Sequence, residues 1–163
     1  MYKRILVPVD GSPTSIRSLD EAIGLAKESG GTIRLIHVLD RIVFAGGETH
    51  TGDVFGLLRE VGEQILQQMK QHADVAGMEV STWLSELQPG RVCDVVAEQA
   101  KAFDADLIVV GTHGRHGVSR LLVGSDAEQI VRVAPVPVLV VRGEASAAFR
   151  TGAEAARKAK ATP

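Results

Sequence analysis

The feature of this sequence that most constrains its fold is a regular alternation of short aliphatic runs with amphipathic segments. Within the amphipathic segments, apolar side chains recur every three or four residues, which is the spacing of a helix with one buried face. Strands that are separated by single helices pair in parallel through right-handed crossovers. The chain is therefore predicted to form an α/β fold, a three-layer α/β/α sandwich around a parallel sheet. The predicted strands are Ile5–Val9, Ile33–Leu39, Met78–Leu87, Asp106–Val110 and Pro135–Arg142, and the apolar stripes of the predicted helices cover 16–26, 54–72, 92–100 and about 119–133.

Two of these strands have sequences that favour the edges of the sheet. Met78–Leu87 is more polar than the others, and Pro135 and Pro137 have no N–H to donate to a neighbouring strand. The five strands and their helices predict one domain over residues 1–143. Residues 144–163 are rich in Ala with scattered Lys and Arg, and we expect them to form a flexible or weakly helical tail.

The composition argues against several classes of partner. Eighteen basic and twenty acidic side chains give a net charge of −2, whereas nucleic acids and anionic membranes require a basic face. Aromatic residues make up 4% of the chain, which is too few for a surface that stacks bases. A single cysteine, Cys93, rules out an internal disulfide, and no apolar run is long enough to span a membrane. We therefore expect a cytoplasmic protein with neither a nucleic-acid nor a membrane partner.

Two predicted strand ends carry residues suited to binding an anion. Asp10-Gly11-Ser12 follows the first strand, and a loop from Gly111 to Gly117 follows the fourth, with Gly124-Ser125 further along. Glycines let backbone N–H groups approach a phosphate, and the next helix adds the positive end of its dipole. Asp10 suits a ribose hydroxyl or a hydrated Mg²⁺ that bridges phosphates. In an open parallel sheet, ligands bind beyond such strand ends where the strand order reverses.

Each of these signals alone is also compatible with ordinary structure. A Gly-x-x-Gly pair is common in loops, and an Asp in the position of Asp10 can be the N-cap of the next helix. The combination of two glycine sites with an acidic residue at the end of the first strand favours a ligand.

This arrangement resembles the ATP-binding branch of the universal stress protein family. That branch is marked by Gly, two residues, Gly, nine residues and then Gly-Ser or Gly-Thr, and Gly111, Gly114, Gly124 and Ser125 have this spacing. The resemblance extends over about residues 2–142, because the segments 3–12, 104–111 and 134–142 also match the family.

The resemblance implies a sheet of order 3-2-1-4-5, of the adenine nucleotide alpha hydrolase-like type, and ATP accompanied by Mg²⁺ or Mn²⁺. Asp10 would then face the ribose and adenine and serve as the metal ligand, and the backbone of Val38 would read the adenine edge. Gly111 and Gly114 would line the ribose and phosphates, and Gly124 and Ser125 would hold the phosphates. The family also implies a homodimer through the last strand, Val136 to Arg142. The full set of implied nucleotide-binding residues is Pro8, Val9, Asp10, Val38, Val110, Gly111, Thr112, His113, Gly114, Arg115, Gly124, Ser125 and Asp126.

Asp126 departs from the pattern, because a small or apolar residue often follows the Gly-Ser pair in the nucleotide-binding branch. A carboxylate there repels phosphates unless it turns away or joins a metal, and it can instead favour the helix. His113 and Arg115 fit either a solvent-exposed loop or phosphate contacts.

The remaining candidate residues have plainer interpretations. His37 and His72 are interpreted as packing residues. Cys93, near the start of a helix, is interpreted as a structural thiol rather than one of lowered pKa.

Several motifs of nucleotide-dependent enzymes do not occur in the sequence. It contains no Gly-x-x-x-x-Gly-Lys-Ser/Thr, no pair of glycines separated by one residue, and no Gly-x-Ser-x-Gly. Binding is therefore predicted over turnover, and no catalytic residue is assigned. Two alternatives remain open at this point: a slow ATP hydrolase or phosphotransferase that uses Asp10, His113 and a metal, and a nucleotide-free stress protein that acts through protein contacts.

Overall fold

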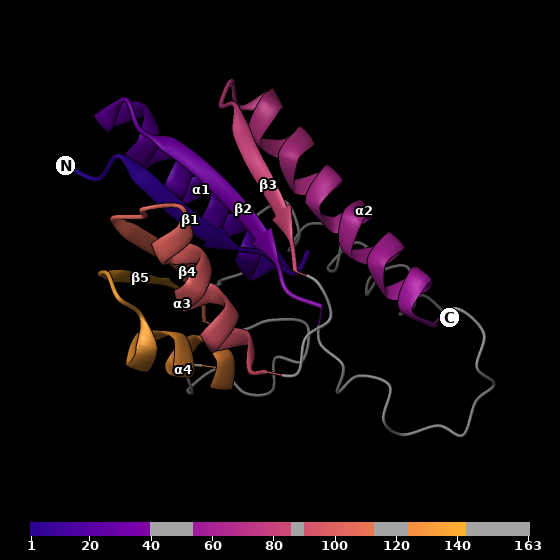
Figure 1. Ribbon diagram of the computed structural model, residues 1–163. Helices are drawn as coiled ribbons and strands as arrows, with labels where there is room; N and C mark the ends of the chain where they lie inside the picture. Colours follow the sequence, from indigo (N-terminus) through magenta and orange to yellow (C-terminus); the bar gives the residue numbers. More distant parts are fainter. Residues whose placement is uncertain (40–53, 86–89, 113–123, 143–163) are drawn as a thin grey trace, which may run out of the picture.

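The computed structural model describes residues 1–39, 54–85, 90–112 and 124–142, and these contain five strands and four helices in strict alternation (Figure 1). None of the described helices is both long and apolar enough to cross a membrane. In chain order the elements are β1 (Arg4–Pro8), α1 (Pro13–Ser29), β2 (Thr32–His37), α2 (Val54–Val75), β3 (Val80–Leu84), α3 (Val92–Ala102), β4 (Leu107–Gly111), α4 (Ser125–Val133) and β5 (Val138–Val141).

The strands form one parallel sheet of order β3-β2-β1-β4-β5. This order confirms the prediction, including the places of the polar strand and the proline-preceded strand at the two edges. The chain moves outward from β1 to β3 and then returns to the other side of β1 with β4. The strand order therefore reverses between β1 and β4, which is the topological switch point of the sheet.

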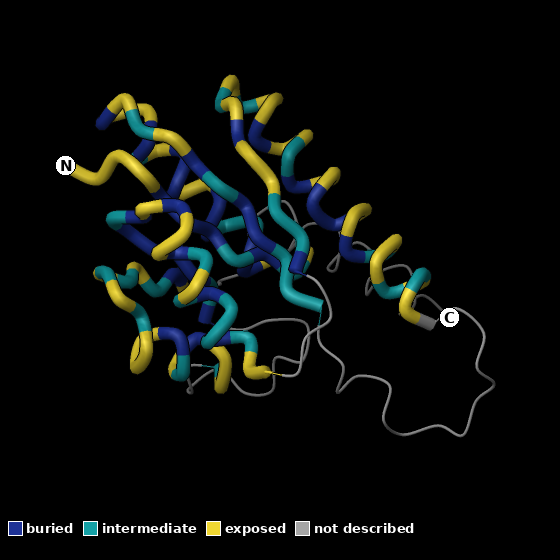
Figure 2. The backbone as a smooth tube through the Cα atoms, viewed as in Figure 1, coloured by how far each residue is buried: buried dark blue, intermediate teal, exposed yellow. Residues whose placement is uncertain are grey.

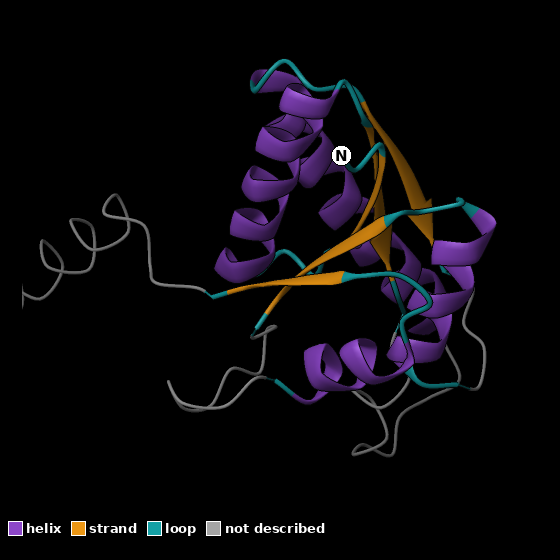
Figure 3. Ribbon diagram, turned by 90° about the vertical axis from the view of Figure 1, so that its left-hand side faces the viewer, coloured by secondary structure: helices purple, strands orange, loops and turns teal. Residues whose placement is uncertain are grey.

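Two apolar cores lie on opposite faces of the sheet. Alternate residues of each strand point to opposite faces, so that Ile5 and Val7 join one core while Leu6 joins the other. Helices α1 and α2 cover the first face and α3 and α4 the second, and Figure 3 shows helices on both sides of the strands. In Figure 2 the central strands are largely dark blue, whereas the helices are yellow on their outer sides. The three-layer sandwich predicted from the alternation is thus confirmed.

The structure corrects the predicted boundaries of several elements. A continuous helix from about residue 119 is wrong, because Gly124 has extended backbone angles (φ −55°, ψ 148°) and α4 begins at Ser125. The last strand is shorter than predicted and begins at Val138, after the two prolines. The third strand is also shorter, Val80–Leu84. Periodicity and aliphatic content locate an element, whereas its ends depend on caps and pairing partners.

The amino-terminal ends of β1 and β4 are tied together by a carboxylate. Asp106 precedes β4, and its two oxygens accept hydrogen bonds from the backbone N–H groups of Lys3 (2.7 Å) and Arg4 (3.0 Å). The N–H of Asp106 in turn donates to the carbonyl of Arg4 (2.9 Å). The end of α3 is held to the same place, because Arg4 Nε donates to the carbonyl of Phe103 (2.6 Å) and its guanidinium lies over that ring. These contacts fix the two central strands at the end of the sheet opposite the predicted site.

Replacing Asp106 with Ala is expected to lower the free energy of unfolding by about 1–2 kcal/mol, because two backbone N–H groups lose a charged acceptor. Urea denaturation measures this loss. Asp74→Ala is the matched control, since that carboxylate pairs with Lys70 at the surface of α2 (3.3 Å) and its removal is expected to cost less than about 0.5 kcal/mol. Equal losses in the two variants would show that the tie contributes nothing.

Candidate functional site

The sheet divides at the switch point. Pairing between β1 and β4 covers Ile5 with Leu107 and Leu6 with Ile108, although β1 continues to Pro8. Beyond the paired residues, each central strand stays with its outer neighbour. The N–H of Val9 donates to Ile36 of β2 (2.8 Å).

On the other side of the division, β4 remains paired with β5 as far as Gly111 with Val141. The N–H of Thr112 then donates to the carbonyl of Val141 (2.9 Å). The carboxyl ends of β1 and β4 therefore separate, and their backbone groups turn to β2 and β5.

The two glycine-bearing segments of the predicted phosphate site meet beside this division. The N–H of Gly124 donates to the carbonyl of Thr112 at 2.5 Å, which joins the end of β4 to the start of α4. Gly124 is the N-cap of α4 and makes no side-chain cap hydrogen bond, and Ser125 is exposed at the first position of the helix. The structure thus brings together two of the predicted segments that lie far apart in sequence.

Asp10 shapes the turn that leads from β1 into α1. Its Oδ1 accepts from the N–H of Ser12 (2.9 Å), and Gly11 between them has a positive φ of 77°. The N-cap of α1 is Ser12, whose Oγ accepts from the N–H of Ser15 (3.2 Å), and Pro13 occupies the first turn. The alternative reading of Asp10 as the N-cap is therefore wrong, and its half-buried carboxylate stands at the end of β1.

Gly111 is required by packing within the chain. A Cβ atom at this position would lie 2.7 Å from Cγ2 of Thr14 and 3.1 Å from its backbone carbonyl group. The end of β4 and the first turn of α1 are therefore in direct backbone contact, with no room for a side chain. Thr14 is 9% exposed, so it cannot move aside into solvent.

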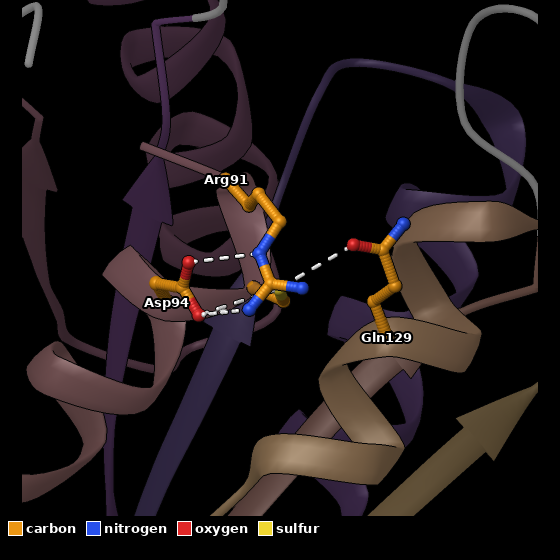
Figure 4. Close-up of polar contacts among 4 residues, drawn as sticks. Arg91, Asp94 and Gln129 are labelled. Atoms are coloured by element: carbon orange, nitrogen blue, oxygen red, sulfur yellow. Dashed lines mark hydrogen bonds and ion pairs between the residues drawn. The ribbon is translucent and has the colours of Figure 1, made fainter. Parts of the chain in front are cut away.

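A polar cluster joins the first turn of α3 to α4 (Figure 4). Arg91 donates to both oxygens of Asp94 at 3.0 Å, and this contact lowers the pKa of the Asp94 carboxyl below its ordinary value. From α4, Gln129 faces the pair, and its Oε1 lies 3.6 Å from Sγ of Cys93. Burial, with a further contribution from Asp94, raises the pKa of the Cys93 thiol above its ordinary value. Cys93 is therefore a structural thiol, as predicted.

The structure places several of the predicted site residues around the switch point. Val9 and Val110 have buried side chains that belong to the two cores, so only their backbone groups can face a ligand. Pro8 and Val38 are half-buried at the ends of β1 and β2, and Asp126 is exposed in the first turn of α4, where a carboxylate favours the helix dipole. The predicted residues His113, Gly114 and Arg115 lie outside the described residues.

Two contacts at the site involve residues that belong to no motif identified in the sequence. His37 is half-buried against α2, as its interpretation as a packing residue predicts, and its Nδ1 also lies 2.7 Å from the carbonyl oxygen of Val9. Thr14 is the residue that Gly111 approaches closely, and nothing in the sequence except the small size of glycine suggests this contact.

The interpretation of His72 as a packing residue is wrong, because its side chain is 42% exposed and its Nε2 lies 2.6 Å from Oδ1 of Asp20.

Among the described residues, no three or more His, Cys, Asp or Glu side chains are grouped so that they could hold a metal ion by themselves. Asp10 supplies one carboxylate at the end of β1, so a divalent cation there would need further ligands from a bound molecule or water. That chemistry suits Mg²⁺, which is usually bound by one or two carboxylates together with phosphates and water.

The fold and the divided sheet define an α/β protein of the class that binds ligands at a topological switch point. A sequence model of the universal stress protein family matches residues 1–142. A universal stress protein of Methanocaldococcus jannaschii is 37% identical over 144 residues, which cover 87% of this chain and 83% of that protein. The chain belongs to the universal stress protein family, which confirms the resemblance stated from the sequence.

Solved structures agree with this assignment. A crystal structure of a universal stress protein family member from Burkholderia pseudomallei has a TM-score of 0.67 at 28% identity, covering 85% of this chain and 95% of that chain. A crystal structure of a universal stress protein in complex with cAMP has a TM-score of 0.63 at 25% identity, covering 86% of this chain and 97% of that chain.

Gly111→Ala is expected to destabilise the fold by about 1–3 kcal/mol, because the new methyl group overlaps Thr14. In a Thr14→Ser background, which lacks Cγ2, the same substitution is expected to cost less, since one of the close contacts is gone. Urea denaturation of the four proteins of this double-mutant cycle provides the test. A cost that is identical in both backgrounds would contradict the proposed clash.

Proposed function

We propose that this universal stress protein binds ATP at the switch point and acts as a regulatory nucleotide-binding module in the stress response. The observation that carries the proposal is the division of the sheet between β1 and β4, with Thr112 and Gly124 joined beside it. The match of the family model to residues 1–142 supports one nucleotide-binding unit over residues 1–143. The related structure in complex with cAMP supports an adenine nucleotide as the ligand class.

The phosphates are assigned to the start of α4. Backbone N–H groups in the first turn of a helix have no partners within the helix and carry the positive end of its dipole. Gly124, the N-cap, has no side chain to compete with an anion for these groups, and the exposed Ser125 adds a hydroxyl donor. The loop residues Gly114 and Arg115 would complete this end of the site.

The nucleoside is assigned to the ends of β1 and β2. Asp10 is half-buried at the end of β1, where its carboxylate can accept from a ribose hydroxyl or take part in binding Mg²⁺ or Mn²⁺ between itself and the phosphates. The backbone of Val38 would meet the base. When bound, the metal would neutralise phosphate charge, and the chain's own residues would hold the nucleotide in place.

The Gly124→Ala variant is expected to weaken ATP binding at least tenfold, equivalent to about 1.4 kcal/mol, while leaving the fold intact. The backbone angles of Gly124 are open to any residue, so an added methyl group introduces no backbone strain, and it would obstruct a ligand that approaches the start of α4 closely. Calorimetry with Mg²⁺–ATP, on protein freed of copurifying nucleotide, measures the affinity. Gly24→Ala is the matched control, because a Cβ there meets nothing within 4 Å and the position lies in α1.

The same samples separate the proposal from its two alternatives. Release of inorganic phosphate that requires Mg²⁺ or Mn²⁺ and is lost in Asp10→Ala would indicate a slow ATP hydrolase. If the wild-type protein, freed of copurifying nucleotide, binds no ATP, the result would indicate a nucleotide-free stress protein that acts through protein contacts.

We also propose that β5 pairs with its counterpart in a second copy to form a homodimer. It is an edge strand, and Leu139 in its middle is 38% exposed. An aliphatic edge strand left open invites pairing with another chain, so that an isologous partner strand would satisfy its backbone and cover this side chain.

Leu139→Lys is expected to convert the dimer to a monomer, because a charge would be buried between two copies of the strand. Light scattering coupled to size exclusion gives the mass of each variant. Val75→Lys serves as the control, since Val75 is 92% exposed at the end of α2. A Leu139→Lys protein that remains dimeric would refute this interface.

A further inference from the structure

The end of β1 is bonded to β2 through both of its backbone groups, and one of these bonds comes from a side chain. The N–H of Val9 donates to the carbonyl of Ile36 (2.8 Å), as in an ordinary parallel ladder. The carbonyl of Val9 lies 2.7 Å from Nδ1 of His37. Because a carbonyl oxygen only accepts, Nδ1 carries the hydrogen and donates it.

The imidazole occupies the place of the next backbone donor in the ladder. Pro8 is paired with Ile36, and a ladder that continued would direct the N–H of Val38 to the carbonyl of Val9. His37 supplies that hydrogen bond instead. Among the described residues, the backbone N–H and C=O of Val38 accordingly have no hydrogen-bond partner.

The segment around Val38 is held on both sides. The carbonyl of His37 accepts from the N–H of Ser85 (2.9 Å), and the Oγ of Ser85 accepts from the N–H of Leu39 (2.7 Å). Ser85 is 3% exposed, so these bonds are shielded from water. Successive residues of an extended chain direct their backbone groups to opposite sides. Since His37 faces β3 and Ile36 faces β1, the N–H and C=O of Val38 face the β1 side, where the switch point lies.

The imidazole ring itself is seated against α2. A Cβ atom at Gly62 would lie 3.0 Å from Cδ2 of His37, and closer still to methyl groups of Leu39 and Leu84. The missing side chain at position 62 thus makes the room in which the ring lies. Its orientation toward Val9 is therefore fixed by packing as well as by the hydrogen bond.

We propose that His37 is a positioning residue for base recognition: its hydrogen bond to Val9 holds the end of β1 on β2 and reserves the N–H and C=O of Val38 for the edge of a purine base. This inference rests on the proposed binding of an adenine nucleotide. An N–H beside a C=O matches the acceptor and amino donor on the adenine edge. Guanine presents a carbonyl and an N–H there in the opposite order, so the same pair of backbone groups favours adenine over guanine.

The test is equilibrium binding of ATP, GTP and inorganic tripolyphosphate, each with Mg²⁺, to the wild-type chain and to His37→Leu. Loss of the imidazole hydrogen bond is expected to weaken ATP binding about tenfold and to lower the preference for ATP over GTP. Tripolyphosphate binding is expected to stay within about twofold, because α4 is untouched. In contrast, Gly124→Ala is expected to weaken ATP and tripolyphosphate alike. His72→Leu, an exposed histidine of α2, is the matched control and is expected to bind as the wild type does.

Conservative variants distinguish positioning from a general structural role. The side-chain amide nitrogen of Asn is attached where Nδ1 is attached in His, so His37→Asn is expected to keep ATP affinity within about threefold of the wild type. His37→Gln sets its amide one bond further out and is expected to bind as weakly as His37→Leu. If His37→Leu does not fold, the difference in ATP affinity between His37→Asn and His37→Gln provides the test.

The outcomes of these measurements are distinct. The role of His37 would be overturned, and ATP binding left in place, if the wild type and His37→Leu bound ATP with equal affinity. Equal affinities of the His37→Asn and His37→Gln variants would have the same meaning. Equal loss of ATP and tripolyphosphate in His37→Leu would also overturn it. A wild-type chain that binds none of the three ligands would overturn the proposed function and this inference together.

Discussion

The pairing of each central strand with its outer neighbour is the interaction on which the site depends. Backbone N–H and C=O groups that leave a sheet need new partners, because an unpaired polar group that is removed from water is costly. At the carboxyl end of this sheet, Val9 finds its partners in β2 and Thr112 finds one in β5. At the amino end, Asp106 holds β1 and β4 together. The sheet is thus joined at one end and divided at the other.

Two glycines of the motif serve different physical purposes. Gly111 is needed because Thr14 already fills the space that a side chain would take, so its identity reports packing of β4 on α1. Gly124 has backbone angles that any residue adopts, so a substitution there brings no backbone strain, and it would obstruct a ligand at the start of α4. The spacing motif does not distinguish these two roles, because both positions are simply glycine in the sequence. The distinction matters for mutagenesis, since loss of binding at the first position would be confounded with loss of stability.

The architecture could be predicted from the sequence because it follows from periodicity and connection rules that act along the whole chain. Strand order required the family resemblance as well, and both edge strands were identified from polarity and proline. Helix starts were less predictable: α4 begins at Ser125 because of how Gly124 bonds to Thr112, a contact between distant residues. His37 packs against α2 as predicted, but its hydrogen bond could not be predicted for the same reason, since nothing in the neighbouring sequence reveals that the ring reaches the carbonyl of Val9.

His37 at the end of β2 and Gly62 in α2 are distant in sequence but pack against each other. The residues that one position tolerates therefore depend on the residue at the other. A methyl group added at position 62 would collide with the imidazole and with the two leucines around it. A larger residue at position 62 therefore requires changes at all three neighbours, His37, Leu39 and Leu84. These positions are expected to show epistasis, because a larger residue at position 62 is tolerated only where the side chains that face it have changed.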